Sequence, residues 1–145
     1  MSWDLLANDV LDRVRREHHP RCFVCRDEGF RGLGVRFELR DDGGVEATAV
    51  CPASWEGYPG LVHGGIITSL MDGAMVNALF AREVVAVTVD LQIRFRAPLP
   101  LGQTVTIVGE VTRFTPFISS AEARVVSGTT VYATATGRFM PRGEG

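Results

Sequence analysis

Apolar and polar positions along the chain follow two different periods. Near the start, apolar residues recur every four positions among aspartates and arginines over residues 3–16, which is the spacing of an amphipathic helix. Ser2 is a suitable N-cap for this helix, and the segment His18-His19-Pro20 stops it because proline cannot continue the hydrogen-bonded backbone. We therefore predict an N-terminal amphipathic helix. Its apolar positions are Leu6, Val10 and Val14.

A long apolar run occupies residues 60–80. It contains the glycine pair Gly64-Gly65 near its start and a single carboxylate, Asp72. At 100° per residue, most apolar side chains of a helix here fall on one side and most small or polar ones on the other. We predict a loop that leads into a buried helix whose second face carries Asp72. The core face holds Ile67, Leu70, Met71, Ala74 and Ala78, and the small, polar face holds Gly65, Thr68, Ser69, Asp72, Gly73 and Val76.

Alternating apolar and polar residues indicate strands on both sides of this helix. Residues 35–39 and 45–49 alternate around a turn of two aspartates and two glycines, which predicts a hairpin. Four β-rich segments follow the long helix, and the last three can form an antiparallel meander. They span residues 84–96, 104–114, 117–127 and 129–139. A curved antiparallel sheet wrapped around one long central helix satisfies this order, so we predict an α+β domain with an extra N-terminal helix.

The composition is that of an ordinary globular domain. The chain has 145 residues, of which 46% are hydrophobic and 22% charged, and this predicts one domain with a sizeable core. A net charge of -2 gives no electrostatic reason to expect nucleic acid or an anionic membrane surface as a partner. No cationic start is followed by an apolar signal segment, and His63 and Asp72 interrupt the longest apolar run. We therefore expect a cytoplasmic protein that does not span a membrane.

Three cysteines are an odd number, which argues against a disulfide framework and predicts free thiols at Cys22, Cys25 and Cys51. The first two follow His18 and His19 closely, and four such ligand types in one segment suit a zinc site. The alternative is a packed pair of thiols, which we favour. We expect no metal and no cofactor.

Asp72 needs an explanation, because a charge in an apolar helix is costly unless it is paired, hydrated or used. One explanation is structural: Asp72 lies at a wet subunit contact or is bonded to Ser69 and Thr68. The other explanation is chemical: Asp72 acts as a base or nucleophile, and the backbone N–H of Gly64 at the helix start stabilises the negative charge that the reaction builds. Eight residues separate Gly64 from Asp72, or about 12 Å along a helix, so one helix cannot supply both to one site. A two-fold dimer with antiparallel helices solves this by placing Asp72 of one chain opposite Gly64 of the other.

The loop and the first turns of the predicted helix read Trp55-Glu56-Gly57-Tyr58-Pro59-Gly60-Leu61-Val62-His63-Gly64-Gly65-Ile66-Ile67-Thr68-Ser69-Leu70-Met71-Asp72. This segment resembles the hotdog-fold thioesterases of the PaaI type. Two further segments are similar to the family, Cys22-Phe23-Val24-Cys25 with Gly32 to Phe37, and Val87 to Pro98. The resemblance implies a single hotdog domain over residues 1–145, made of an N-terminal helix (1–20), a cysteine-containing loop (21–32) and a hotdog core (33–140).

The resemblance also implies a function. Members hydrolyse acyl-CoA thioesters as homodimers with a continuous sheet, often as dimers of dimers. Carried over by position, Gly64 and Gly65 supply oxyanion N–H groups, Asp72 acts as general base or nucleophile, and Thr88 places a hydroxyl beside the attacking water. We expect His63 to position the loop backbone and the helix start rather than to act as a base. The residues expected to contact substrate are Gly57, Tyr58, Ser69 and Val76.

Two positions depart from the family pattern. Gly57 stands six residues before His63, where many members have Asn or Gln, and Gly73 follows Asp72, where many have Glu. The missing side-chain donor at Gly57 keeps a second hypothesis open, a non-catalytic protein that binds acyl-CoA or another small ligand. A hydratase or dehydratase on the same fold is disfavoured, because a histidine is expected early in the loop where Trp55 and Glu56 stand.

Overall fold

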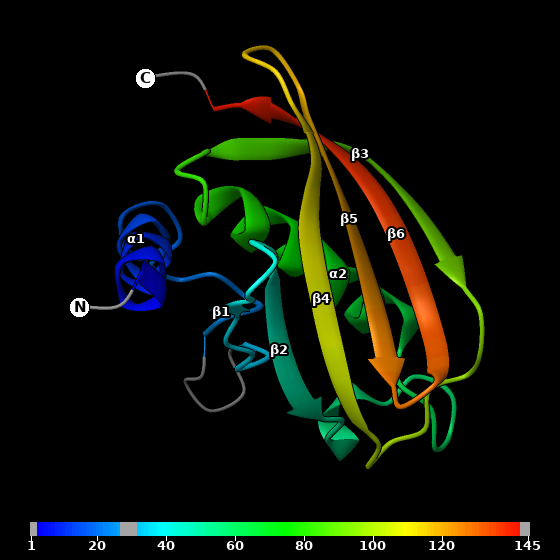
Figure 1. The fold of residues 1–145 in the computed structure, drawn as a ribbon. Helices are drawn as coiled ribbons and strands as arrows, with labels where there is room; N and C mark the ends of the chain where they lie inside the picture. Colours follow the sequence, from blue (N-terminus) through cyan, green and yellow to red (C-terminus); the bar gives the residue numbers. More distant parts are fainter. Residues whose placement is uncertain (1–2, 27–31, 143–145) are drawn as a thin grey trace.

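The computed structural model describes residues 3–26 and 32–142, with side chains from residue 8 onward (Figure 1). Ser2 and the side chain of Leu6 therefore lie outside the described part of the chain. Helix α1 (Trp3–His18) extends two residues beyond the predicted end and stops just before Pro20. Its apolar face is buried at Leu11 and Val14, so the amphipathic prediction is confirmed where side chains are described.

One antiparallel sheet of six strands forms the larger part of the fold, in the order β1-β2-β4-β5-β6-β3. The strands are β1 (Glu38–Leu39), β2 (Val45–Val50), β3 (Ala86–Phe95), β4 (Thr104–Phe114), β5 (Ser119–Ser127) and β6 (Thr130–Pro141). The predicted meander of the last three strands is confirmed, and a short 3-10 helix, η1 (Ala53–Trp55), lies in the loop before the central helix.

The first strand is much shorter than the alternation predicted. Val35, the first residue of the predicted strand, does not pair with the next strand, because its backbone N–H, like those of Leu33 and Gly34 before it, donates to a carbonyl of the cysteine-containing turn. Leu33 N–H bonds Phe23 O at 2.7 Å, and Val35 N–H bonds Val24 O at 3.0 Å. The alternation of residues 35–39 thus reflects burial on one face rather than a full strand pairing.

Helix α2 (Gly64–Phe80) runs along the concave side of the curved sheet (Figure 1). All five residues of its predicted core face are buried, and Leu70, Met71 and Ala74 have no exposed surface. The inward positions of the central strands are often small, so the sheet packs closely on the helix. These positions include Ala121, Ala123, Ala133 and Ala135. Gly73 and Val76 of the predicted polar face are buried as well, because the cysteine-containing turn covers part of that face.

Strand β3 forms one border of the sheet. It pairs with β6 on one side, and within residues 3–26 and 32–142 no strand pairs with its other side. Three apolar side chains on this strand, Val87, Val89 and Phe95, are 46 to 54% exposed. A long, open and partly apolar strand edge favours pairing with another chain. Within the described ranges, neither helix has the length and apolar character needed to cross a membrane.

Candidate active site

The start of α2 is organised by His63. This residue is the N-cap, and its Nδ1 atom accepts a hydrogen bond from Gly65 N–H at 2.8 Å. Because Nδ1 accepts, the ring proton lies on Nε2. The backbone N–H of His63 donates to Trp55 O at 2.8 Å, which ties the loop to the helix. The structure therefore places His63 where a residue that sets the helix start has to lie.

Gly57 packs directly against His63. A Cβ atom built on Gly57 would lie 3.0 Å from the Cα and 3.2 Å from the Cβ of His63. Since contacts of 3.0 to 3.4 Å force a neighbour to move, an Asn or Gln at this position would displace the histidine or its loop. The glycine at position 57, which departs from the family pattern, thus leaves the space in which His63 lies close to the loop backbone.

The two glycines at the helix start are not equivalent. Gly65 N–H already donates to His63, whereas Gly64 N–H has no acceptor among the described residues. Gly64 is the first residue of α2, where free N–H groups and the helix dipole attract negative charge. The Phe95 ring of β3 lies nearby, with its Cζ atom 3.5 Å from the position of a Cβ built on Gly64. Of the two glycines, Gly64 is therefore the one whose N–H is free to bind an anionic group.

Asp72 lies about two turns further along α2 and is half-buried. Its Oδ1 atom accepts a hydrogen bond from Thr88 Oγ1 of β3 at 2.8 Å. Burial raises the pKa of Asp72 above its ordinary value, the Thr88 hydrogen bond opposes this rise, and the charge of Cys22 adds to it. A carboxylate with a raised pKa is a stronger base than an exposed one.

The structural explanation of Asp72 through Ser69 and Thr68 is wrong. Thr68 Oγ1 donates to Gly64 O and Ser69 Oγ donates to Gly65 O, each at 2.9 Å. Hydroxyl groups inside a helix commonly bond the carbonyl one turn earlier, so neither is left for the carboxylate. The other structural explanation, a wet subunit contact, stays a prediction.

The four residues expected to contact substrate lie in different surroundings. Gly57 lies against His63, and Tyr58 is 80% exposed in the loop before α2. Ser69 uses its hydroxyl within the helix, and Val76 is only 6% exposed. The structure therefore brings Thr88 to Asp72 and His63 to Gly65, whereas the four expected substrate contacts differ widely in exposure.

One buried polar residue on α2 was not predicted from the sequence. Asn77 is 1% exposed, and its Nδ2 atom donates to Gly73 O at 2.8 Å and contacts Cys25 Sγ at 3.8 Å. Its Oδ1 atom accepts from Arg15 Nη1 at 3.3 Å. Asn77 interrupts an otherwise apolar run, and that interruption is the signal that could have identified it. It links helix α1, the cysteine-containing turn and helix α2.

The histidines and cysteines considered as zinc ligands are not arranged as a metal site in the described part of the chain. His18 is exposed and lies 3.8 Å from Glu17, while His19 packs edge-on against Phe80 with a centroid distance of 4.9 Å. In residues 3–26 and 32–142, no three His, Cys, Asp or Glu side chains are placed as a metal site requires. Cys22, Cys25 and Cys51 are free thiols, as predicted.

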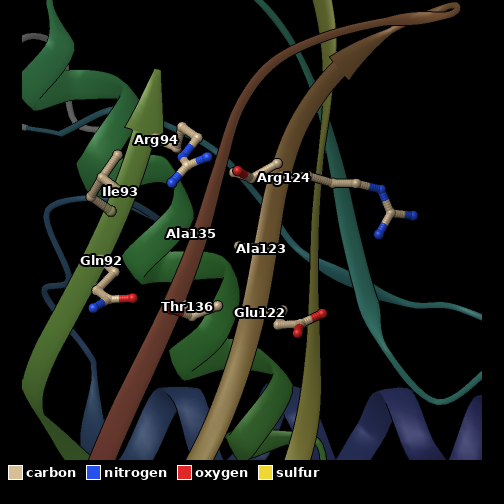
Figure 2. A pocket seen from close by; sticks show the side chains of 9 residues that line it. Gln92, Ile93, Arg94, Glu122, Ala123, Arg124, Ala135 and Thr136 are labelled. Carbon is tan, nitrogen blue, oxygen red and sulfur yellow. The ribbon is translucent and has the colours of Figure 1, made fainter. Parts of the chain in front are cut away.

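A shallow hollow lies on the outer face of the sheet, away from this chemistry. Figure 2 shows Gln92 and Arg94 of β3, Thr136 of β6, and Glu122 and Arg124 of β5 around it, with α2 behind the strands. The hollow shares no residue with the start of α2 or with Asp72. Its lining is polar and open, so we assign it no part in the site.

Comparison with known proteins identifies the family. Residues 59–134, slightly more than half of the 145 residues, match the model of the thioesterase superfamily. The chain belongs to this superfamily. It is 31% identical over 87 residues to acyl-coenzyme A thioesterase THEM4 of Bos taurus, and the alignment covers 59% of this chain and 35% of that protein. The chain thus spans about a third of the length of this curated relative.

Solved structures agree with this assignment at the level of the fold. One is a mutant form of the phenylacetic acid degradation protein PaaI from Thermus thermophilus, with a TM-score of 0.69, 23% identity, and coverage of 76% of this chain and 95% of that chain. Another is a hypothetical thioesterase protein from Streptococcus pneumoniae solved with coenzyme A, with a TM-score of 0.70, 22% identity, and coverage of 76% and 90%. The predicted hotdog fold and the resemblance to PaaI-type thioesterases are confirmed.

Proposed function

We propose that this protein hydrolyses acyl-CoA thioesters. The observation that carries the proposal is the half-buried Asp72 on α2, held by Thr88 and raised in pKa, in a chain of the thioesterase superfamily. The kinship with an acyl-coenzyme A thioesterase and the coenzyme A in one structural neighbour support CoA esters as the substrate class. These names describe the relatives, so the substrate remains a proposal for this chain.

Gly64, Asp72 and His63 have separate roles in the proposed reaction. Hydrolysis of a thioester builds negative charge on the carbonyl oxygen, and Gly64 N–H is oriented to stabilise it at the positive end of the helix dipole. Asp72 receives the Thr88 hydrogen bond on Oδ1, and Oδ2 has no donor among the described residues. Oδ2 is thus available to take a proton from water or to attack the carbonyl carbon itself. His63 positions the helix start through Gly65.

The site requires two chains. Gly64 and Asp72 stand about 12 Å apart along one helix, whereas a base and an oxyanion donor both lie within about 3 Å of the reacting atoms. We propose a homodimer in which two β3 edges pair, the two α2 helices run antiparallel, and each Asp72 faces Gly64 of the partner subunit. The open edge of β3 and its exposed apolar side chains support this arrangement. A dimer of dimers is a larger assembly of the same kind.

A second function, binding of acyl-CoA without turnover, is favoured by one observation. Gly57 has no side-chain donor, and His63 lies too close for one to be added without movement. This hypothesis keeps the fold and the dimer but removes the hydrolytic step.

A thiol-release assay across short, long and aromatic CoA esters separates the two functions. We expect turnover of at least one ester by the wild-type protein. Asp72→Asn is the matched control, because it keeps the size of the side chain and removes the basic lone pair, and turnover should fall by about 100-fold or more. Tight binding of CoA esters without thiol release would support the binding function instead. Undiminished turnover in a folded Asp72→Asn dimer would contradict the catalytic role of Asp72.

A further inference from the structure

Cys22 and Cys25 lie in one turn of the chain between α1 and β1. Arg26 N–H donates to Cys22 O at 2.9 Å, which closes a single helical turn and places the two cysteines three residues apart on it. Residues three apart on a helical turn have Cβ atoms about 5–6 Å apart, which small adjustments bring into the range of a disulfide. The two thiols lie close enough for each to shift the pKa of the other. Both thiols are free in this structure.

The turn is fixed next to Asp72. Val24, between the two cysteines, packs on Gly73 so closely that a Cβ on Gly73 would lie 2.8 Å from Val24 Cγ1. Backbone hydrogen bonds from Leu33, Gly34 and Val35 hold the other side of the turn. Gly73 is the neighbour of Asp72 in α2, so the thiols and the carboxylate belong to one rigid arrangement. The charge of Cys22 acts on Asp72, as does that of His19.

The two thiols differ in their surroundings. The pKa of Cys22 is lowered to about 4, first because the Cys25 thiol hydrogen-bonds to it, and further because His19 and the backbone of Val24 and Cys25 do so too. The pKa of Cys25 is raised, because its hydrogen bond to Cys22 and its burial both favour the neutral thiol. A nucleophilic thiolate beside a protonated second thiol is the arrangement that thiol–disulfide exchange requires.

We propose that Cys22 and Cys25 are a reversible redox pair that exchanges with low-molecular-weight disulfides. The Cys22 thiolate attacks one sulfur of the disulfide, a mixed disulfide forms, and one small thiolate leaves and takes up a proton. Cys25 then loses its proton and attacks Cys22 Sγ, the intramolecular disulfide forms, and the second small thiolate leaves. The protein loses two electrons and the Cys25 proton, and the external disulfide is reduced to two thiols, which take up that proton and one from solvent.

Oxidation of Cys22 and Cys25 to a disulfide should change the pKa of Asp72. The groups that act on Asp72 are Thr88 from β3, and Cys22 and His19 from the segment after α1. The negative charge of Cys22 raises the pKa of Asp72, so loss of that charge in the disulfide lowers it. This part of the inference rests on the proposed function, because it is read from the acidic limb of thioester hydrolysis.

The experiment equilibrates the intact chain in buffers with defined ratios of glutathione to glutathione disulfide. Free thiols are then alkylated and the products are mapped by mass spectrometry. We expect a Cys22–Cys25 disulfide at oxidising ratios, its reversal at reducing ratios, and the same result in Cys51→Ser. Cys25→Ser should accumulate a mixed disulfide with glutathione on Cys22, whereas Cys22→Ser should accumulate much less on Cys25. If either variant fails to fold, the formation and reversal of the Cys22–Cys25 disulfide in the wild-type protein still test the proposal.

Three outcomes would overturn the proposal. They are thiols that stay reduced in glutathione disulfide, a disulfide that involves Cys51, and thiols masked by one zinc per chain in protein purified without chelator. If the disulfide forms, the acidic limb of turnover should move to lower pH in the oxidised protein. A redox pair that forms in a protein without turnover would uphold the exchange chemistry and contradict the proposed function instead.

Discussion

Gly64 supplies the N–H on which the proposed oxyanion hole depends, and Gly64→Pro removes that N–H by closing a ring onto the backbone nitrogen. The first N–H groups of a helix have no acceptor within it, so the helix loses no hydrogen bond. Proline is well accepted at the first helical position, and it requires an extended residue before it. His63 already is extended, with φ -61° and ψ 132°. We therefore expect α2 to form normally in this variant.

The expected loss of activity is large and the expected change in stability is small. Removal of one preorganised oxyanion donor lowers kcat by about 10²- to 10³-fold. Gly65 cannot replace it, because its N–H donates to His63 Nδ1 at 2.8 Å. The free energy of unfolding should change by less than about 1 kcal/mol, since a proline in a compatible position mainly restricts the unfolded chain.

Gly64→Ala is the matched control, because it adds a side-chain atom and keeps the N–H. Its Cβ would lie 3.5 Å from Phe95 Cζ, an ordinary van der Waals contact. Thiol release at saturating acyl-CoA, together with melting temperature and oligomeric state, should show loss of turnover in Gly64→Pro and near wild-type turnover in Gly64→Ala. A folded Gly64→Pro dimer with wild-type turnover, or an equal loss in both variants, would refute the assignment of Gly64 N–H.

Three further predictions concern the neighbouring groups. Thr88→Val removes the hydrogen bond that opposes the raised pKa of Asp72, so the acidic limb of turnover should move to higher pH, while Thr88→Ser should leave it in place. Sedimentation at micromolar concentration should detect no stable monomer, and a fully active monomer would exclude shared sites. Gly73→Ala should lower the melting temperature despite its better helix propensity, because Val24 occupies the space; in a Val24→Ala background the same change should cost less, since of the Val24 side chain only its Cβ, 3.1 Å from the new Cβ, remains there.

The sequence predicted elements well where local pattern and tertiary structure agree. Strand β4 (Thr104–Phe114) has the predicted bounds. Its alternation of apolar and polar residues stops at both ends where the chain leaves the sheet. The core face of α2 was also predicted, since a buried helix must place its largest apolar side chains together. The hairpin before α2 was predicted only in part, because residues 33–35 bond to a turn that the pattern could not locate.

Single residues of the candidate site could be predicted from the sequence, but the contacts between them could not. The helix rise alone separates Gly64 from Asp72, and the resemblance pointed to Thr88. The use of Gly65 N–H by His63 depends on a ring orientation that no spacing encodes. The contacts of Asn77 with Arg15 and Cys25 join residues 62 and 52 positions apart, and local periodicity carries no information about such contacts. The residues that surround and support the site could therefore be found only from the structure.

The most direct test of the shared active site is complementation between two inactive variants. Gly64→Pro retains Asp72, and Asp72→Asn retains the Gly64 N–H. In a mixed dimer one site combines the intact Asp72 with the intact Gly64 of the partner subunit, and the other site lacks both. Unfolding and refolding an equal mixture should produce about half mixed dimers with one working site each, and so about a quarter of wild-type turnover. Turnover that stays at the level of the separate variants, with mixed dimers verified by mass spectrometry, would contradict the shared site.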